Sequence, residues 1–308
     1  MKTRQKKEHY SGLRPTKGWP ARNYKFFFHR VFPQLIKEPV GESREALLTP
    51  PPKGSVRVTW IGHASFYIQF HDRDLLIDPV WGEWLGFFRR KRRPGLSLAS
   101  MPEVDTVLVS HAHADHLHRH TLRQIQSRHG IVVAKGSGSL VQKLGFSRIQ
   151  EMTVWDTIDV NGIEIQHTPS LHWGARFGLD TFRDYGGYLI SYDGITLYHA
   201  GDTAYFEKFT EIKERAKRAI DIAILPIGAY EAPSGRNVHM TPEEAVQSFQ
   251  DLGAHVMLPM HHDTFPLGNE ADGEASQKLL AEAKRVGLSA HIQAPDCGEE
   301  FLYSPPHA

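Results

Sequence analysis

The chain has 308 residues, 40% of them hydrophobic, and a formal net charge of +1 at neutral pH. This is enough apolar material for a sizeable core, so the composition argues against a disordered protein. A net charge near zero supplies no long-range field that would attract nucleic acid, and no nucleic-acid partner is expected. Cys297 is the only cysteine, which rules out an intramolecular disulfide and fits a reducing compartment.

No apolar run approaches the roughly 20 residues that span a bilayer. Residues 1–15 also lack the apolar core of a secretory signal peptide. The sequence therefore predicts a cytoplasmic protein and leaves contact with the periphery of a membrane open. Positive charge gathers in the N-terminal stretch and in a basic run, which contain Lys2, Arg4, Lys6, Lys7 and Arg89, Arg90, Lys91, Arg92, Arg93.

Residues 1–54 are rich in Lys, Arg and Pro and end in the turn-forming run Thr49–Gly54. We interpret them as an N-terminal basic and aromatic arm or cap, outside a catalytic domain that spans residues 55–308. Within the arm, Tyr24–Phe32 is predicted to form either a short amphipathic helix or an irregular apolar clasp. Such an apolar arm could also be covered by a second copy of the chain, in a homodimer.

From residue 55 onward, short β-branched and apolar runs alternate with turns, as is typical of strands. Residues 241–244 read Thr-Pro-Glu-Glu, a helix start with a capping residue, a first-turn proline and first-turn acids. Strands are expected at 56–61, 65–70, 74–78, 104–110, 131–134, 151–155, 163–168, 186–192, 195–200, 221–226 and 255–260, and helices at 117–129 and 274–286. This order predicts an α+β fold whose sheet layers are sandwiched by helices.

Residues 111–116 read His-Ala-His-Ala-Asp-His, directly after the apolar strand expected at 104–110. A loop that leaves a strand can aim several side chains at one point beyond the sheet edge. Imidazole nitrogens and a carboxylate are ligands that suit Zn²⁺ and similar divalent ions. His118 and His120 extend the cluster, which leaves open a solvated histidine-rich loop that binds no metal.

Three other loops weaken that alternative, because each carries an imidazole or a carboxylate where an expected strand ends. His172 lies in the first loop, and Asp202 lies in the second, where Gly201 permits a sharp turn. His261 and His262 begin the third loop. One such residue alone would more often cap or pack, but four loops of this kind in one chain indicate a metal site.

Several stretches then appear in an order shared with a known family, over roughly residues 55–270. They are Thr59–Ala64, Ile77–Pro79, Leu108–Leu117, Thr168–Trp173, His199–Thr203, Pro226–Glu231 and His239–Ala245. The sequence resembles the metallo-β-lactamase superfamily, and most closely its N-acyl-phosphatidylethanolamine-hydrolysing phospholipase D family. The 111–116 motif specifies only the superfamily, whereas Gly228–Glu231 and His239–Ala245 are more particular to the phospholipase-like branch. The resemblance implies an αβ/βα four-layer sandwich of metallo-β-lactamase type.

The resemblance also implies a site for two divalent metal ions. Zinc is the expected metal, and iron or manganese would fit the same ligands. The implied ligands are His111, His113 and His172 for one ion, Asp115, His116 and His261 for the other, and Asp202 as the bridge. His261 is preferred over His262 because it is the first histidine after the strand and aligns with the family's final ligand.

Two such ions would lower the pKa of bound water from its bulk value to about 7, so that hydroxide is available near neutral pH. Asp115 could also orient this nucleophile or accept its proton, which makes Asp115 a catalytic candidate. By the resemblance, His239 would approach the substrate phosphate or leaving group, as a catalytic and substrate-binding residue. Tyr230 would line the substrate pocket, while His63 and Asp78 would either orient metal-binding imidazoles or serve a structural role.

Residues 81–88 bring Trp81, Trp84, Phe87 and Phe88 next to the basic run. This segment could touch an anionic lipid surface, with aromatic side chains inserted and cations on the headgroups. Equally, it could fold its aromatic side chains into the core and leave its arginines solvated. Together with Phe26–Phe28 of the arm, it could form one lipid-entry surface.

Three functions are consistent with these observations. The favoured one is a phosphodiesterase of phospholipase D type that acts on N-acyl-phosphatidylethanolamine-like lipids, with a phospholipid or another small molecule as substrate. The second is a metal-dependent lactonase or other carbonyl hydrolase that uses the same metals. The third is a non-catalytic metal-binding or scaffold protein, against which the full set of candidate ligands argues. Nuclease activity is not expected, since no basic face extends beyond the short run.

Overall fold

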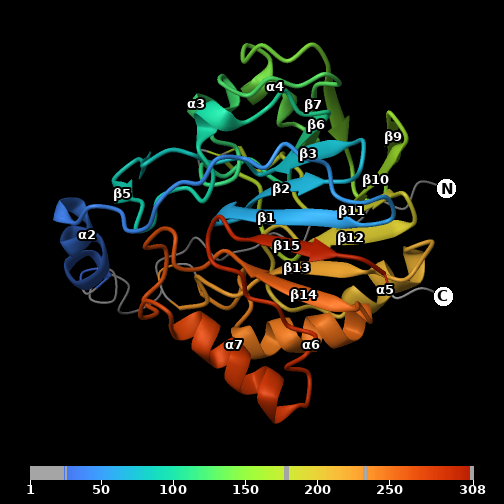
Figure 1. The fold of residues 1–308 in the computed structure, drawn as a ribbon. Helices are drawn as coiled ribbons and strands as arrows, with labels where there is room; N and C mark the ends of the chain where they lie inside the picture. The colour runs from blue at the N-terminus through green and yellow to red at the C-terminus, as the bar shows by residue number, and fades with distance from the viewer. Residues whose placement is uncertain (1–23, 25, 177–179, 232, 234, 306–308) are drawn as a thin grey trace.

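Two β-sheets lie face to face at the centre of the molecule, and helices cover both outer faces (Figure 1). The computed structural model describes residues 24, 26–176, 180–231, 233 and 235–305, so the N-terminal lysines and Arg4 lie outside the described residues. The layers run helix, seven-stranded sheet, six-stranded sheet, helix. The predicted four-layer α+β sandwich is confirmed.

The seven-stranded sheet has the strand order β15-β1-β2-β3-β6-β7-β8. Its strands are β1 (Val56–Gly62), β2 (Ser65–Gln69), β3 (Asp74–Ile77), β6 (Thr106–Val109), β7 (Ile131–Ala134), β8 (Ile149–Met152) and β15 (Glu300–Tyr303). The first three form the predicted antiparallel meander, whereas β3, β6, β7 and β8 run parallel. The carboxyl ends of β3 and β6 therefore meet at one edge.

The six-stranded sheet has the order β14-β13-β12-β11-β10-β9. Its strands are β9 (Thr157–Val160), β10 (Ile163–Thr168), β11 (Gly187–Tyr192), β12 (Ile195–His199), β13 (Ile222–Pro226) and β14 (Val256–Met260). Strands β9 to β12 pair antiparallel, and β12, β13 and β14 pair parallel. The parallel half again brings several carboxyl ends to a common edge.

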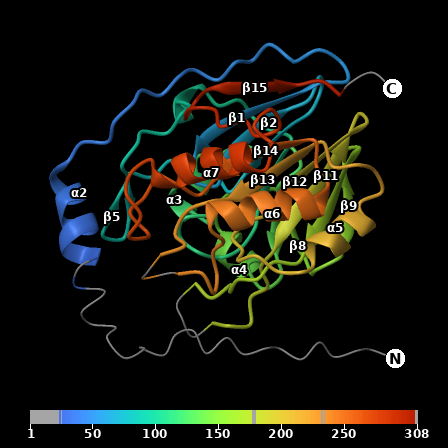
Figure 2. The same ribbon diagram turned by 90° about the horizontal axis from the view of Figure 1, so that it is seen from below.

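Helices cover the outer faces because each presents an apolar side to a sheet. Helices α3 (Arg119–Leu122) and α4 (Gly138–Val141) and the 3₁₀ turn η3 (Leu98–Ser100) belong to the seven-stranded side, and α5 (Phe209–Arg215), α6 (Pro242–Leu252) and α7 (Glu274–Arg285) to the other. Figure 2 shows α6 and α7 lying across the six-stranded sheet. Adjacent residues of β6 face opposite sides of the sheet, so Leu108 packs in the core between the sheets and Val109 in the core under the outer helices. Both sides of β6 are therefore apolar, which explains the continuous apolar run in its sequence.

Two predicted elements are wrong in part, and others were not foreseen. The strand expected at 151–155 ends at Met152, because the chain turns at Trp155, which has a φ of 72°. Instead of a helix over 117–129, only the short α3 forms, capped by His118, whose ring accepts the Thr121 N–H. The chain after α3 is not helical. Its backbone pairs with Val104 instead, since the Val104 N–H donates to the Gln126 carbonyl oxygen and the Arg128 N–H donates to the Val104 carbonyl oxygen. The unforeseen β9 and β15 are both sheet edges with mostly exposed or half-buried residues, so they lack an apolar run.

The N-terminal segment lies against a small hairpin at the end of the sandwich. It contains the π-helical turn η2 (Phe27–Val31) and α2 (Phe32–Ile36), and the hairpin strands are β4 (Trp84–Leu85) and β5 (Phe88–Arg89). Figures 1 and 2 both place α2 beside β5. Of the two conformations predicted for this part of the arm, the helical one forms over the described residues 26–36. The domain boundary at residue 54 and the homodimer stay predictions.

Among the described residues, no helix combines the length and the apolar character that crossing a membrane requires. The predicted cytoplasmic location and peripheral membrane contact are not tested by this finding.

Helix α6 begins as the sequence predicts. Thr241 accepts the Glu244 N–H while the Glu244 carboxylate accepts the Thr241 N–H, which is a complete capping box. We expect Thr241→Ala to lower the free energy of unfolding by about 1 kcal/mol, because the Glu244 N–H at the start of the helix loses its hydroxyl acceptor. Thr241→Ser keeps the hydroxyl and is the matched control. Urea denaturation measures both, and equal stability of the two variants would contradict this account.

Candidate metal centre

The candidate ligands converge because the strands that precede them end at the same edge of the sandwich. The residues that follow strand ends are His63 after β1, Asp78 after β3, His111 after β6, His172 after β10, Asp202 after β12 and His261 after β14. Three of them, His63, Asp78 and His261, have positive φ angles of 56°, 44° and 62°. This sparsely populated backbone conformation is tolerated at functional sites that the surrounding structure holds in place. Gly201 has a φ of 60°, so the sharp turn predicted there is confirmed.

The first ligand group joins His111, His113, His172 and Asp202. His113 Nδ1 lies 2.9 Å from His111 Nε2 and 3.2 Å from His172 Nε2. Asp202 Oδ2 lies 3.9 Å from His111 Nε2 and 3.7 Å from His172 Nε2. Ligand atoms about 2.0–2.1 Å from a tetrahedral zinc ion lie about 3.3 Å from one another, close to these separations.

The second group joins Asp115, His116 and His261, together with His63. Asp202 Oδ2 also reaches this group, at 3.2 Å from His116 Nε2 and 3.1 Å from His261 Nε2. Asp115 Oδ2 lies 3.7 Å from His261 Nε2. One carboxylate oxygen of Asp202 therefore faces both groups, which is the arrangement expected of a bridging ligand.

Buried polar atoms without a partner test whether a cation fits here. Among the described residues, Asp202 Oδ1, His116 Nε2 and His261 Nε2 are buried and make no hydrogen bond. Such atoms are costly unless something satisfies them. A divalent ion would do so, and imidazole with carboxylate is a donor set that zinc accepts. The clusters can therefore bind metal, while the individual ligand roles and the number of ions stay predictions.

Electrostatics keep most of these groups in the form that a metal needs. Burial lowers the pKa of His113 to about 3 and that of His172 to about 4, so both imidazoles offer free lone pairs at neutral pH. Burial alone would raise the pKa values of Asp115 and Asp202, but the neighbouring histidines, His116 foremost, hold both well below 3.8. Both carboxylates are therefore ionised.

A buried network orients His116. Its Nδ1 lies 2.7 Å from Asp78 Oδ2, and Asp78 also accepts the Ser110 backbone N–H and hydroxyl at 2.7 and 2.6 Å. The fully buried Asp78 thereby fixes the ring and directs Nε2 to the site. His172 is held in a similar way, since its Nδ1 lies 3.0 Å from the Val238 carbonyl oxygen. The structure thus favours the orienting alternative for Asp78.

His63 lies closer to the centre than its early position in the chain suggests. Its Nε2 is 2.9 Å from Asp115 Oδ2, and its ring lies over His261 with centroids 4.0 Å apart. The backbone is anchored by Thr264 Oγ1, which accepts the His63 N–H at 2.7 Å, and by the His261 N–H, which donates to the His63 carbonyl. His63 therefore either orients Asp115 or belongs to the ligand group itself.

Arg176 is a supporting residue that the sequence analysis does not single out. Its Nη1 donates to the carbonyl oxygens of Ala112 and Leu117, at 2.9 and 2.7 Å, and so clamps both ends of the ligand loop. No motif marks this arginine, because its partners are backbone groups about 60 residues away along the chain.

His239 lies beside the centre, as the resemblance implied. It forms a third group with Asp202 and His261, and its ring is stacked on His261 with centroids 5.0 Å apart. Burial lowers its pKa well below 6.5, so the ring is neutral, and Nδ1 has no partner among the described residues. A neutral imidazole of this kind can donate or accept one hydrogen bond to a substrate.

Other histidines serve structural roles. His118 caps α3, His120 is exposed, and His199 lies 3.1 Å from the Ala64 carbonyl oxygen. His262 points away from the centre, because it pairs with Asp263 at 2.9 Å and stacks on Trp60. Of the two adjacent histidines, the structure therefore places His261 in the centre.

The expectation for Tyr230 needs correction. Its hydroxyl donates to Glu274 at 3.2 Å and accepts from Lys278 at 3.3 Å, so it faces α7 and is not among the residues that line the pocket beside His261. Ala229, which precedes it, has a φ of 59° and turns the chain in this direction.

The basic run at 89–93 differs from both of its predicted alternatives. Arg90 is only 1% exposed, and it donates to the carbonyl oxygens of Val80 and Gly82 while its guanidinium lies over the Phe265 ring. Arg89 pairs with Glu38 and Glu83, and Lys91 pairs with Asp272. Three of the five cations are therefore used within the protein, so the expected layer of cations on lipid headgroups is wrong for them.

The aromatic side chains of residues 81–88 divide between the two alternatives, since Trp81 and Phe88 pack against apolar clusters while Trp84 and Phe87 are exposed. Trp84 is 44% and Phe87 54% exposed, and Phe28 and Phe32 of the N-terminal segment are also exposed. Ring contacts join the two segments, with Phe27 and Phe87 centroids 5.6 Å apart and Phe26 and Phe88 centroids 6.2 Å apart. We call Tyr24, Phe28, Phe32, Trp84 and Phe87 the aromatic face.

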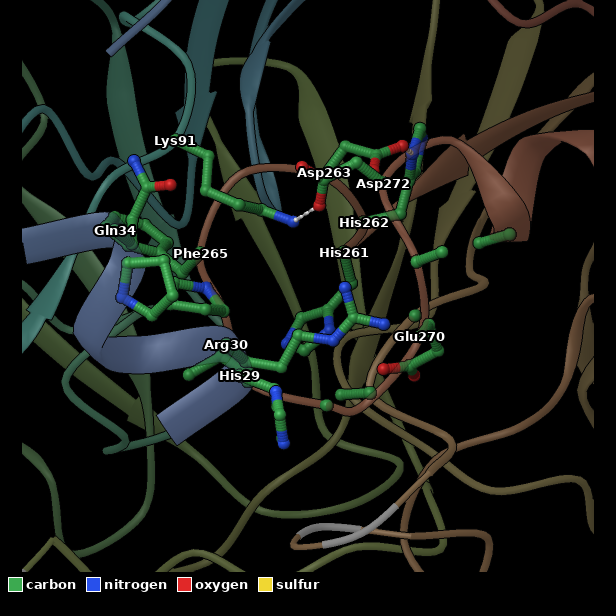
Figure 3. A pocket seen from close by; sticks show the side chains of 18 of the residues that line it. His29, Arg30, Gln34, Lys91, His261, His262, Asp263, Phe265, Glu270 and Asp272 are labelled. Atoms are coloured by element: carbon green, nitrogen blue, oxygen red, sulfur yellow. Dashed lines mark hydrogen bonds and ion pairs between the residues drawn. The ribbon is translucent and has the colours of Figure 1, made fainter. Parts of the chain in front are cut away.

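A pocket with a cavity volume of about 90 Å³ opens beside His261 (Figure 3). The N-terminal segment forms one wall through His29, Arg30 and Gln34. The loop that follows His261 contributes further lining residues, including Phe265 and Glu270. Burial raises the pKa of Glu270, although backbone N–H groups partly oppose this shift. The space is polar and joins the centre at its His261 side.

Fold and donor set together define a metal-dependent hydrolase of the metallo-β-lactamase type. Residues 73–262 match the family described as the beta-lactamase superfamily domain. The chain belongs to the metallo-β-lactamase superfamily, which confirms the predicted resemblance.

Two curated relatives illustrate the range of the family. A yeast (Saccharomyces cerevisiae) protein named mitochondrial N-acyl-phosphatidylethanolamine-hydrolyzing phospholipase D is 32% identical over 257 residues, which are 78% of this chain and 54% of the relative. This chain thus spans about half the length of that protein. A metal-dependent hydrolase of Methanoculleus marisnigri is 34% identical over 235 residues, covering 75% of this chain and 88% of the relative.

Solved structures support the fold. A metallo hydrolase from Ignicoccus hospitalis superimposes with a TM-score of 0.62 at 24% identity, covering 81% of this chain and 98% of that one. An isothiocyanate hydrolase from Delia radicum gut bacteria gives a TM-score of 0.67 at 21% identity, covering 80% and 99%. At this identity the likeness concerns the fold alone.

Metal uptake should depend on pH. Burial alone would lower the pKa of His261, but Asp202 and Asp115 raise it to about 9, so the metal-free centre holds a proton there below that pH. Because a metal needs neutral rings, zinc must displace this proton and that of His116. Burial alone would lower the pKa of His116, but Asp202 and Asp78 hold it well above 6.5. Affinity should therefore rise by about tenfold or more per pH unit between about pH 7 and 9. Calorimetric zinc titrations of the chelator-stripped protein, in buffers with different ionisation enthalpies, measure affinity and proton release. Constant affinity without proton release would contradict the assigned protonation.

Proposed function

We propose that the protein is a phosphodiesterase of phospholipase D type whose substrates are phospholipids of the N-acyl-phosphatidylethanolamine kind. The observation that carries the lipid part is the aromatic face, which exposes large apolar side chains on the N-terminal segment and the hairpin, next to the pocket of His261. Contiguous exposed apolar surface on a soluble domain marks an interaction site. The activity in the yeast relative's name supports the phosphodiester part of the proposal.

The metal ions, Asp115 and His239 would each have a separate role in the hydrolysis. Divalent ions bound to the clusters would acidify water and stabilise negative charge on a phosphoryl oxygen. Asp115 is ionised and reaches the second group, so it can accept a proton from the attacking water or hold that water in place. His239 can donate a hydrogen bond to a phosphate or leaving-group oxygen, since its neutral ring faces the same cluster. No serine or cysteine nucleophile is required.

Membrane contact would rest on apolar insertion more than on charge. Arg89, Arg90 and Lys91 are already engaged inside the protein, whereas Trp84 and Phe87 are half exposed. Side chains of this type enter the interface between headgroups and acyl chains. The aromatic face would thereby hold the mouth of the site against a lipid surface, and a peripheral location at a membrane follows as part of this proposal.

Metal content and hydrolysis of bis(p-nitrophenyl) phosphate test the proposed activity. We expect roughly two metal ions per chain in the wild type, and a loss of turnover on the order of 100- to 1,000-fold in Asp202→Ala, because the shared carboxylate disappears. His120→Ala removes an exposed histidine of α3 that belongs to none of the ligand groups, and it serves as the control.

Two outcomes would change this assignment. Bound metal without phosphodiester turnover would favour the lactonase or carbonyl hydrolase that the sequence left open. A metal-free protein after metal-replete purification would overturn the metal centre itself.

The aromatic face is tested separately. In the double variant Trp84→Ser, Phe87→Ser, partitioning onto phosphatidylcholine vesicles should fall by about tenfold or more, because two large apolar side chains no longer leave water. Leu302→Ser removes an exposed apolar residue of β15 and is the control. Flotation with vesicles measures binding, and thermal melting checks the fold. Unchanged vesicle binding and lipid turnover in a folded double variant would refute this role.

A further inference from the structure

The N-terminal segment supplies a cation to the pocket beside His261. Arg30 lies in η2 and lines this pocket with His261 and His262, and Figure 3 shows its side chain reaching toward the middle of the pocket. None of the sequence motifs includes Arg30. Its presence here results from the packing of the N-terminal segment against the hairpin and the loop after β14.

Most other charges around the pocket are already matched. Lys91 Nζ lies 2.7 Å from Asp272 Oδ1, and His262 Nδ1 lies 2.9 Å from Asp263 Oδ2. Glu270 accepts the backbone N–H of Glu231 at 3.3 Å. These partners satisfy the carboxylates without Arg30.

Arg30 is different. Within the described part of the chain, no carboxylate lies within ion-pair distance of it, and its only hydrogen bond runs from Nη2 to the Asn269 carbonyl oxygen, at 2.5 Å. A guanidinium carries five N–H donors in a rigid fork. The bond to Asn269 fixes the orientation of the side chain and leaves further donors for a ligand that enters the pocket.

We propose that Arg30 binds a phosphate oxygen of the substrate in the pocket beside the metal centre, and so acts as a specificity-determining residue. This inference rests on the phosphodiester function proposed above. The planar fork matches pairs of oxygens on a phosphate, and Arg30 is half-buried, so a bound anion would be only weakly screened by solvent. The N-terminal segment would thus complete the substrate site as well as carry part of the aromatic face.

A carboxylate presents a similar pair of oxygens, so the test includes both anions. Calorimetry on the zinc-loaded full chain measures binding of diethyl phosphate and, in a second arm, of 4-hydroxybutyrate, the product class of a lactonase. We expect diethyl phosphate to bind the wild type and to bind Arg30→Met about tenfold to a hundredfold more weakly, through loss of a charge-assisted hydrogen bond. Arg30→Lys should lie between them, because it keeps the charge and loses the fork.

The matched control is Arg93→Met, which removes an exposed arginine that does not line the pocket. Thermal melting and zinc content of each variant separate lost binding from lost folding. With bis(p-nitrophenyl) phosphate, Arg30→Met should raise KM more than it lowers kcat, as expected of a residue that binds the substrate.

Equal affinity of the wild type and folded Arg30→Met for diethyl phosphate would overturn the proposal, as would the absence of any binding by the wild type. Arg30-dependent binding of 4-hydroxybutyrate but not of diethyl phosphate would also overturn it, in favour of a carboxylate. Arg30-dependent binding of diethyl phosphate without turnover would support the site while refuting the proposed function, so the two failures are distinguishable.

Discussion

The arrangement of the whole site depends on one oxygen, Asp202 Oδ2, which lies 3.2 and 3.1 Å from the Nε2 atoms of His116 and His261 and within 4 Å of His111 and His172. Four loops from two sheets must meet within this distance. They can do so only because β6 and the parallel strands β12 and β14 end at one edge. The two sheets are packed face to face through a continuous apolar core, which fixes these strand ends relative to one another.

Around this centre, the chain uses buried polar contacts to hold the loops in place. Asp78 orients His116, and Arg176 clamps the ligand loop through two carbonyl oxygens. Arg90 links the segment before the β4–β5 hairpin to the loop after β14. It donates to the Val80 carbonyl oxygen, and its guanidinium lies over the Phe265 ring. Burial lowers the pKa of Arg90 to about 10, so it stays charged at neutral pH and its bonds to carbonyl oxygens remain charge-assisted.

Much of the fold and of the candidate site could be predicted from local patterns. The predicted bounds of strand β10 agree with the structure at both ends, and helix α6 begins at its predicted cap, because apolar periodicity and capping chemistry are properties of neighbouring residues. The exceptions have a common cause. The helix expected at 117–129 is cut short by backbone bonds to Val104, and Tyr230 is drawn toward α7 by Glu274 and Lys278, all of them contacts between distant segments.

The sequence by itself determined the class of site, because ligand types, their spacing and their positions after strands are encoded within short stretches such as residues 111–116. Only the tertiary structure decided how the charges are used. It buried Arg90, paired Lys91 with Asp272 and brought Arg30 to the pocket of His261. Whether a cation is solvated, paired or directed at a ligand depends on which distant segments pack around it, and no local pattern in the sequence carries that information.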